Sequence, residues 1–162
     1  MSYILGSASR KALKGVHPDL VRTVELAIKQ TAQDFRVHAG LRTLARQRVL
    51  VARGVSWTLD SKHLRQADGF GHAVDLVPLI GGRLVWDWPG CRKIALAMAH
   101  AARIAGIALR WGGVWDKPLG DYAYSLGAIE AEGQAYIARR RKLGKRAAMD
   151  GVHFELVTQS QR

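Results

Sequence analysis

One acidic residue interrupts the most apolar stretch of the chain and limits how that stretch can fold. Residues 73–79 read Ala-Val-Asp-Leu-Val-Pro-Leu, which predicts a buried β-strand with Asp75 in its interior. An unpaired carboxylate is costly to bury, so the fold must bring a cationic partner to Asp75. Either a metal ion or an arginine side chain would meet this requirement.

The rest of the chain predicts helices and short strands in a mixed order. Apolar residues at helical spacing and capping residues predict helices over residues 18–34, 43–53, 91–106 and 125–144. Further strands are expected over residues 35–39, 107–111 and 152–157, with a hairpin turn at Gly81-Gly82 that leads into residues 83–86. No internal repeat or flexible linker divides the chain. We therefore expect one α+β domain over residues 1–162, in which helices flank a small antiparallel sheet.

The charge balance predicts a polyanionic partner. The chain has 25 Lys and Arg against 13 Asp and Glu, which gives a formal net charge of +12 at pH 7. Nucleic acid, anionic lipid and envelope polymers would all satisfy this charge, so charge alone does not choose between them. The single cysteine, Cys91, excludes an internal disulfide framework and a cysteine-rich zinc finger.

The N-terminal region and the hydropathy pattern bear on where the chain acts. No apolar run approaches the roughly 18 residues of a membrane span. The apolar patch near the N-terminus is too short for the core of a signal peptide. We therefore expect synthesis in the cytosol and a separate exit route for any role outside it.

Three polar segments contain histidines close to acids, and together they predict a metal site. A catalytic zinc ion needs three nitrogen or oxygen ligands and an open position for water. His63, Asp75 and His153 can supply a His-Asp-His set from one loop and two strands. Strand alternation places His153 and Glu155 on one face of their strand, so His153 can face the site.

Five short motifs follow one another in order. They are residues 40–47 (Gly-Leu-Arg-Thr, then Arg-Gln), 61–64 (Ser-Lys-His-Leu), 71–76 (Gly-His-Ala-Val-Asp-Leu), 110–113 (Arg-Trp-Gly-Gly) and 150–156 (Asp-Gly-Val-His-Phe-Glu-Leu). Together they resemble the zinc peptidases of the D-Ala-D-Ala carboxypeptidase (vancomycin-resistance type) superfamily. Within it, the chain is most similar to the phage endolysin branch, the L-alanyl-D-glutamate peptidases that cut peptidoglycan stem peptides.

The resemblance implies a role for each matched residue. It implies that His63, Asp75 and His153 bind Zn²⁺ and that Asp150 is the catalytic carboxylate. It also implies that Arg42 is the cation that stabilises the substrate carbonyl. The implied fold is Hedgehog/D-Ala-D-Ala-peptidase-like.

The implied function is cleavage of the L-Ala–D-Glu bond in the host cell wall, after a holin has opened the membrane. A thin, accessible wall of the Gram-negative type is the expected target, and a monomer is the expected form. Two alternatives stay open. One is a D-Ala-D-Ala carboxypeptidase or dipeptidase of the same fold, and the other is an inactive module that binds cell wall or nucleic acid.

The sequence departs from this family in three places. The spacing of twelve residues from His63 to Asp75 is longer than is common, and the extra residues fall in the loop 64–70, which contains the competing acid Asp68. Val114 stands where the family often has an acid, and Asp116 follows two residues later. Residues 117–148 form a longer segment than expected, interpreted as a basic helical insertion.

Several other side chains are candidates for binding. Six cations lie within residues 139–146, where the helix dipole favours positive charge, and they are candidates for binding anionic envelope lipid or lipopolysaccharide: Arg139, Arg140, Arg141, Lys142, Lys145 and Arg146. Specific nucleic-acid binding is not expected, because no recognition motif accompanies this charge.

Four side chains are candidates for substrate binding: Ser61, His72, Trp111 and Trp115. Glu155 is a second candidate for the general base. Trp57, Trp86 and Trp88 are interpreted as structural, and His17, His38 and His100 are given no role.

Overall fold

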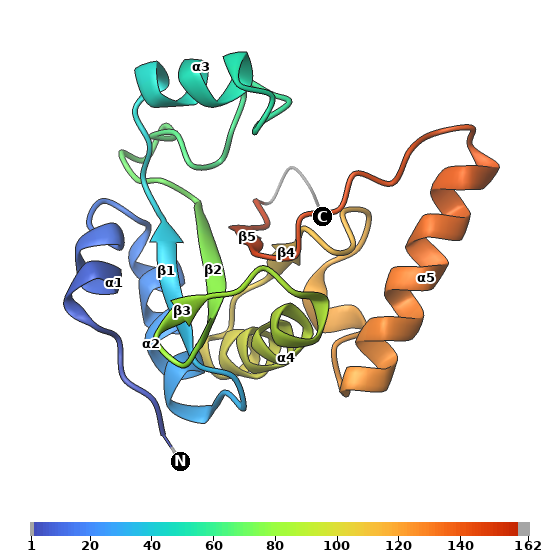
Figure 1. The fold of residues 1–162 in the computed structure, drawn as a ribbon, viewed down its shortest axis with the longest axis horizontal. Coiled ribbons are helices and arrows are strands. Elements are labelled where there is room, and N and C mark those ends of the chain that lie inside the picture. Colours follow the sequence, from blue (N-terminus) through green and yellow to red (C-terminus); the bar gives the residue numbers. More distant parts are fainter. Residues whose placement is uncertain (1, 159–162) are drawn as a thin grey trace.

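A computed structural model describes residues 2–158, and its centre is an antiparallel β-sheet (Figure 1). The strands are β1 (Phe35–Ala39), β2 (Ala73–Ile80), β3 (Arg83–Leu84), β4 (Leu109–Trp111) and β5 (His153–Leu156). Their order is β1-β2-β5-β4, and β3 pairs with the far end of β2. Because β2 has partners on both sides, most of its length is buried, as its apolar sequence predicts.

Helices surround the sheet and confirm the α+β class. They are α1 (Ser7–Ala12), α2 (Pro18–Gln30), α3 (Leu44–Ala52), α4 (Trp88–Ala105) and α5 (Leu126–Lys142), with a 3₁₀ turn η1 (Leu119–Asp121). Helices α2 and α4 pack against each other, and α4 also contacts β2 and β4. Figure 1 shows α5 beside α4. It also shows that α3 lies apart from the sheet, and we call residues 41–52, which include this helix, the α3 arm. Within the described residues, no helix is both long and apolar enough to cross a bilayer.

Side-chain capping explains where two helices differ from the expected bounds. Helix α2 ends at Gln30, before the expected residue 34, because Thr31 is extended and its hydroxyl accepts the Gln33 amide and donates to the Gln33 carbonyl. Helix α4 begins at Trp88, before the expected residue 91, because the Asp87 carboxylate caps it by accepting the Gly90 amide at 2.8 Å. Strands β3, β4 and β5 are shorter than the expected ranges.

Helix α1 was not expected from the sequence. It spans only six residues, and it buries Ser9, whose hydroxyl accepts the Val37 amide of β1 at 3.0 Å. Ser9 is the only buried residue within α1, so the helix has no apolar periodicity to reveal it. Helix α1 packs against β1, the strand that leads to Gly40 and the α3 arm.

Gly40 joins β1 to the arm that carries α3, and the chain passes very close to α1 there. A side-chain carbon at Gly40 would overlap the carbonyl oxygen of Ala12 and approach Val16. The Gly40 carbonyl also accepts a hydrogen bond from Nδ1 of His63 at 2.7 Å. This glycine therefore lets α1, β1 and the His63 loop meet.

We expect Gly40→Ala to lower the free energy of unfolding by about 1–3 kcal/mol, because the backbone of α1 must move to admit the methyl group. The matched control is Gly133→Ala in the interior of α5, where the added carbon meets no atom within 4 Å. The control should stabilise the protein by about 0.5–1 kcal/mol, because alanine favours a helix interior. Denaturant titrations of both variants check this, and equal stabilities would contradict it.

Candidate metal centre

Three buried side chains meet at the end of the sheet near the α3 arm. The Oδ1 atom of Asp75 lies 3.1 Å from Nε2 of His63 and 3.3 Å from Nδ1 of His153. Asp75 on β2 and His153 on β5 are cross-strand partners, so the sheet register brings them together. His63 lies in the loop after α3. The backbone of this loop pairs with that of Arg42, whose amide donates to the His63 carbonyl.

In each imidazole, the ring nitrogen that points away from Asp75 has a hydrogen-bond acceptor beside it. Nδ1 of His63 donates to the Gly40 carbonyl at 2.7 Å, and Nε2 of His153 lies 3.0 Å from Oε2 of Glu155. Such partners fix the tautomer and the ring orientation of metal-binding histidines. Nε2 of His63 and Nδ1 of His153 therefore face the site as potential ligands.

The spacing of the three donor atoms fits a metal ion. A tetrahedral zinc ion with bonds of about 2.0–2.1 Å places its ligand atoms roughly 3.3 Å apart. The two separations from Oδ1 of Asp75, 3.1 and 3.3 Å, are close to this value, and one ligand atom of each of the three residues lies within 4.8 Å of the others. The group His63, Asp75 and His153 can thus hold a metal ion, as the sequence predicts.

Arg42 provides a cationic partner for the buried acid. Its guanidinium donates to Oδ2 of Asp75 at 2.7 Å, which leaves Oδ1 for the two histidines. A second guanidinium nitrogen lies 3.3 Å from the side-chain oxygen of Gln47, and Gln47 in turn holds the loop after α3 by donating to the Thr58 carbonyl. Arg42 therefore orients Asp75 and links it to the α3 arm.

Electrostatics in the metal-free centre favour ionised side chains. Burial acts to raise the pKa of Asp75, but His63 and His153 outweigh it and hold that pKa well below its ordinary range. Burial acts to lower the pKa of His153, but hydrogen bonds with Asp75 and Glu155 raise it to about 9. A metal ion that binds His153 near neutral pH must therefore displace a proton.

Asp150 lies in the same groove and has a different environment. Its backbone amide donates to the Gly112 carbonyl at 2.8 Å, and its carbonyl accepts the His153 amide at 3.2 Å. Burial, followed by the negative charge of Asp75, raises the pKa of the Asp150 carboxyl. A carboxylate with a raised pKa is a better proton acceptor, which suits the predicted general base.

The groove has a volume of about 1310 Å³ and runs between the α3 arm, the sheet and the end of α5. Trp115 stacks at a tilt on His153, with ring centroids 5.1 Å apart, and meets the exposed Trp57 edge-on at 6.3 Å. Trp86 also lines the groove and is 59% exposed. Trp57 and Trp86, interpreted from the sequence as structural, therefore present exposed surface to the groove.

The other predicted substrate-binding residues occupy different places. Ser61 is buried and lines the groove, and its hydroxyl accepts the His63 amide at 3.2 Å. Trp111 is 1% exposed, and its indole donates to the Gly151 carbonyl at 2.7 Å, so it packs in the core. His72 does not line the groove; it pairs with Asp68 at 2.7 Å.

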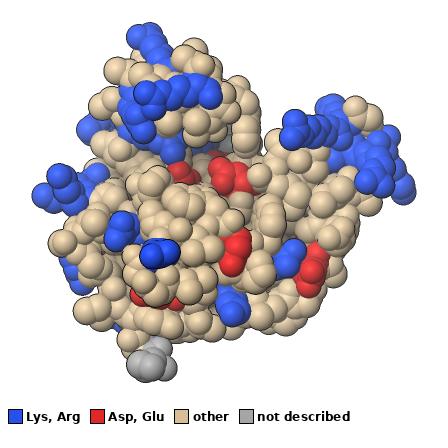
Figure 2. All heavy atoms as spheres, in the orientation of Figure 1, with Lys and Arg blue, Asp and Glu red and all other residues tan. Residues whose placement is uncertain are grey.

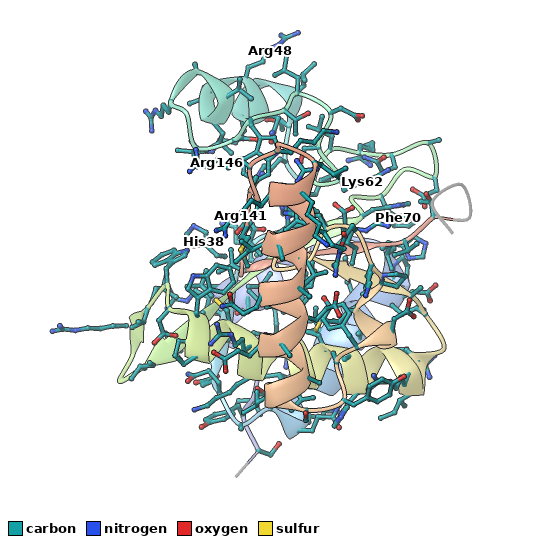
Figure 3. All side chains as sticks on the ribbon, turned by 90° about the vertical axis from the view of Figure 1, so that its right-hand side faces the viewer. His38, Arg48, Lys62, Phe70, Arg141 and Arg146 are labelled. Atoms are coloured by element: carbon teal, nitrogen blue, oxygen red, sulfur yellow. The ribbon has the colours of Figure 1, made fainter. Side chains whose placement is uncertain are left out.

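The basic residues of the 139–146 segment also divide into groups. Arg139 forms ion pairs with Asp116 and Glu132, each at 2.8 Å, so Asp116 is engaged outside the metal centre. Arg140 lines the groove. The remaining four side chains are exposed at and beyond the end of α5, and we call them the basic tip: Arg141, Lys142, Lys145 and Arg146 (Figure 3).

The family model for phage L-alanyl-D-glutamate peptidases matches residues 1–132, which include Arg42, His63 and Asp75. The chain belongs to this family. It is 31% identical over 161 residues to the L-alanyl-D-glutamate peptidase of Escherichia phage T5, and the match covers 97% of this chain and 100% of the relative. The crystal structure of the Serratia marcescens L-Ala D-Glu endopeptidase ChiX is similar with a TM-score of 0.68 and 35% identity, over 95% of this chain and 90% of that one.

The matches also show how this phage L-alanyl-D-glutamate peptidase family member is organised. The family model ends within α5, before Asp150 and His153. The match to the T5 relative covers 97% of this chain, so it extends past residue 132 into the segment that holds Asp150 and His153. The candidate metal centre therefore joins a segment inside the family match to one beyond it.

We expect the metal-free protein to lose stability as the pH rises from about 6.5 to about 9. The pKa of His153 rises from 6.5 to about 9 on folding, so its stabilising contribution is complete below pH 6.5 and is lost through pH 9. Thermal melts in chelator across this range measure the effect. His153→Gln, as the control, should remove this pH dependence, and an unchanged slope in that variant would contradict the assignment.

Proposed function

We propose that this protein is a zinc endopeptidase that cleaves the L-Ala–D-Glu bond of peptidoglycan stem peptides. The observation that carries the proposal is the buried His63-Asp75-His153 group, which opens into a groove beside Asp150 in a chain of this family. Two neutral imidazoles and one carboxylate suit zinc and leave its charge positive. The names of the T5 and Serratia relatives support the bond assigned here.

A bound zinc ion would lower the pKa of its water to about 7 and polarise the scissile carbonyl. In this proposal the Asp150 carboxylate takes the proton of the attacking water and passes it to the leaving amine. Arg42 holds Asp75 in place and adds positive charge near the developing oxyanion. Trp115 and Ser61 line the groove that receives the stem peptide.

Analysis of purified muropeptides by mass spectrometry tests the proposed bond. Products cut between L-Ala and D-Glu are expected, and release of terminal D-Ala would instead identify a carboxypeptidase. Elemental analysis of the protein should find zinc. An inactive wall-binding module would show no chelator-sensitive lysis of permeabilised Gram-negative cells, and that outcome would contradict an enzymatic function.

We expect Asp150→Asn to slow hydrolysis strongly while zinc stays bound, because the amide cannot accept the water's proton. Rates on muropeptides should fall by about 10²–10⁴-fold, the usual contribution of general acid–base catalysis. The comparison variant His63→Ala should lose both activity and zinc. Loss of zinc from Asp150→Asn would show that Asp150 is a ligand and not a base.

We further propose that the basic tip attracts the enzyme to anionic envelope lipid or lipopolysaccharide. Figure 2 shows Lys and Arg side chains gathered over the end of α5 and over α3, on either side of the hollow between them. Each cation near an anionic surface contributes about 1 kcal/mol. Arg139 and Arg140 add less to this attraction, because Arg139 is ion-paired and Arg140 faces the groove.

We expect replacement of the four basic-tip residues by Gln to slow lysis of permeabilised cells several-fold at low salt, with muropeptide hydrolysis unchanged. The slowing should vanish at about 1 M salt, where screening reduces the Debye length to about 3 Å. The control replaces four exposed cations elsewhere: Arg22, Lys29, Arg36 and Arg83. Equal slowing in both variants would show that only net charge matters.

We also propose that the acting form is a monomer without a specific nucleic-acid partner, released to the periplasmic wall from the host cytoplasm by a holin. The phage origin of the family supports this route. Light scattering tests the monomer, and lysis in cells that express the protein with and without a holin tests the route. Lysis that is independent of a holin would contradict it.

A further inference from the structure

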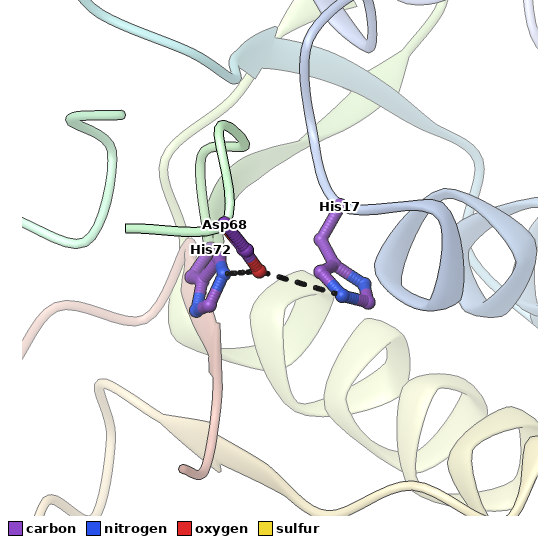
Figure 4. Close-up of side chains that lie close together, drawn as sticks. All are labelled: His17, Asp68 and His72. Carbon is purple, nitrogen blue, oxygen red and sulfur yellow. Dashed lines mark hydrogen bonds and ion pairs between the residues drawn. The ribbon is translucent and has the colours of Figure 1, made fainter. Parts of the chain in front are cut away.

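A second group of potential metal ligands lies outside the groove (Figure 4). Nε2 of His72 lies 2.7 Å from Oδ2 of Asp68, and Nε2 of His17 lies 3.7 Å from the same oxygen. One potential ligand atom from each of the three residues lies within 4.8 Å of the others. The two imidazole rings are nearly perpendicular, with centroids 5.3 Å apart.

Three segments of the chain build this group. His17 precedes α2, Asp68 lies in the loop 64–70, and His72 precedes β2. Because side chains alternate along an extended chain, His72 points to the face opposite Asp75. None of the three residues lines the groove of the first centre.

We propose that His17, Asp68 and His72 form a second site for a divalent transition metal of the zinc class. Two imidazoles and a carboxylate suit such ions. The present separations of 2.7 and 3.7 Å lie on either side of the roughly 3.3 Å expected between ligands of tetrahedral zinc, so shifts of about half an ångström complete the geometry. Asp68 is 40% exposed, which leaves a side open for water as the fourth ligand.

His17 has a carboxylate placed to support metal binding. Its Nδ1 now accepts the Asp19 amide at 3.2 Å, which puts the ring proton of the neutral form on Nε2. A metal ion at Nε2 would move that proton to Nδ1 and break the bond from the Asp19 amide, and Oδ2 of Asp19, now 3.9 Å away, would have to move closer to accept the proton. Carboxylates commonly hold metal-binding histidines in this way.

A metal ion at Nε2 of His72 requires the ring proton of the neutral imidazole to lie on Nδ1. The imidazole is largely buried, and its Nδ1 has no hydrogen-bond partner among the described residues. Nε2 pairs with Asp68, and the ring also contacts that of His17. Moving the ring proton from Nε2 to Nδ1 would therefore break no hydrogen bond at Nδ1 and would free Nε2 for the metal ion.

The site would fasten the loop that joins two ligands of the first centre. Residues 64–70 lie between His63 and β2, and Asp68 is the loop's polar contact with His17 and His72, while the Phe70 ring packs edge-on against His17. The loop already has internal support, since Oδ1 of Asp68 accepts the Phe70 amide at 3.1 Å. A metal ion would add a link from the loop to the start of α2.

Metal stoichiometry tests the site. The wild-type protein, stripped with chelator and titrated with Zn²⁺, should bind two equivalents, and Asp68→Asn should bind one. Asparagine keeps the oxygen that accepts the Phe70 amide but is a poor zinc ligand. Asp121→Asn, an exposed acid elsewhere, is the control and should bind two.

A variant that lacks the histidines of the first centre shows metal binding at the second site alone. His63→Ala/His153→Ala should bind one equivalent of Co²⁺ and show the visible absorption of a tetrahedral ion, and adding Asp68→Asn should remove it. If the double variant does not fold, the comparison of wild type with Asp68→Asn decides alone. One equivalent in the wild type at 100 µM Zn²⁺, or two in Asp68→Asn, would overturn the proposal.

Discussion

The buried carboxylate of Asp75 is the interaction on which the rest of the structure depends. Its two oxygens are divided between partners, with Oδ2 facing Arg42 and Oδ1 facing His63 and His153. These partners come from three distant parts of the chain, so the charge is stabilised only when the α3 arm, the His63 loop and β5 are all in place. The functional centre and the fold are therefore specified by the same contacts.

The two histidines reach Asp75 through different nitrogens because their outer partners differ. A backbone carbonyl at Gly40 holds Nδ1 of His63, which turns Nε2 inward, whereas Glu155 on the same strand face holds Nε2 of His153 and turns Nδ1 inward. The donors are thus oriented before any metal binds, which reduces the ordering that binding requires. The groove beside them, in contrast, is open and lined by exposed aromatic rings from Trp57 and Trp86.

The sequence predicted what depends on local pattern and spacing. Apolar alternation located β1, and a nearly continuous apolar run located β2. Apolar helical spacing located α2 and α4, and the ordered motifs brought together His63, Asp75 and His153. It missed α1, because the one buried residue of this helix is a serine. The Ser9 hydroxyl accepts the Val37 amide of β1, a contact between distant residues that no local pattern reveals. It also named His72 as a candidate for substrate binding, although strand alternation places His72 on the face opposite Asp75; the structure pairs it with Asp68, away from the groove.

The loop between His63 and Asp75 is held at both ends. The backbone amide of His72 donates to the Lys62 carbonyl at 2.7 Å, so the two ends of the loop are joined beside the metal centre. The chain on both sides of the loop is then fixed, through the pairing of Arg42 with Leu64 and of Val16 with Gly71. Residues 64–70 lie between these anchors and do not line the groove. Their course places Asp68 beside His17 and His72, which are also outside the groove.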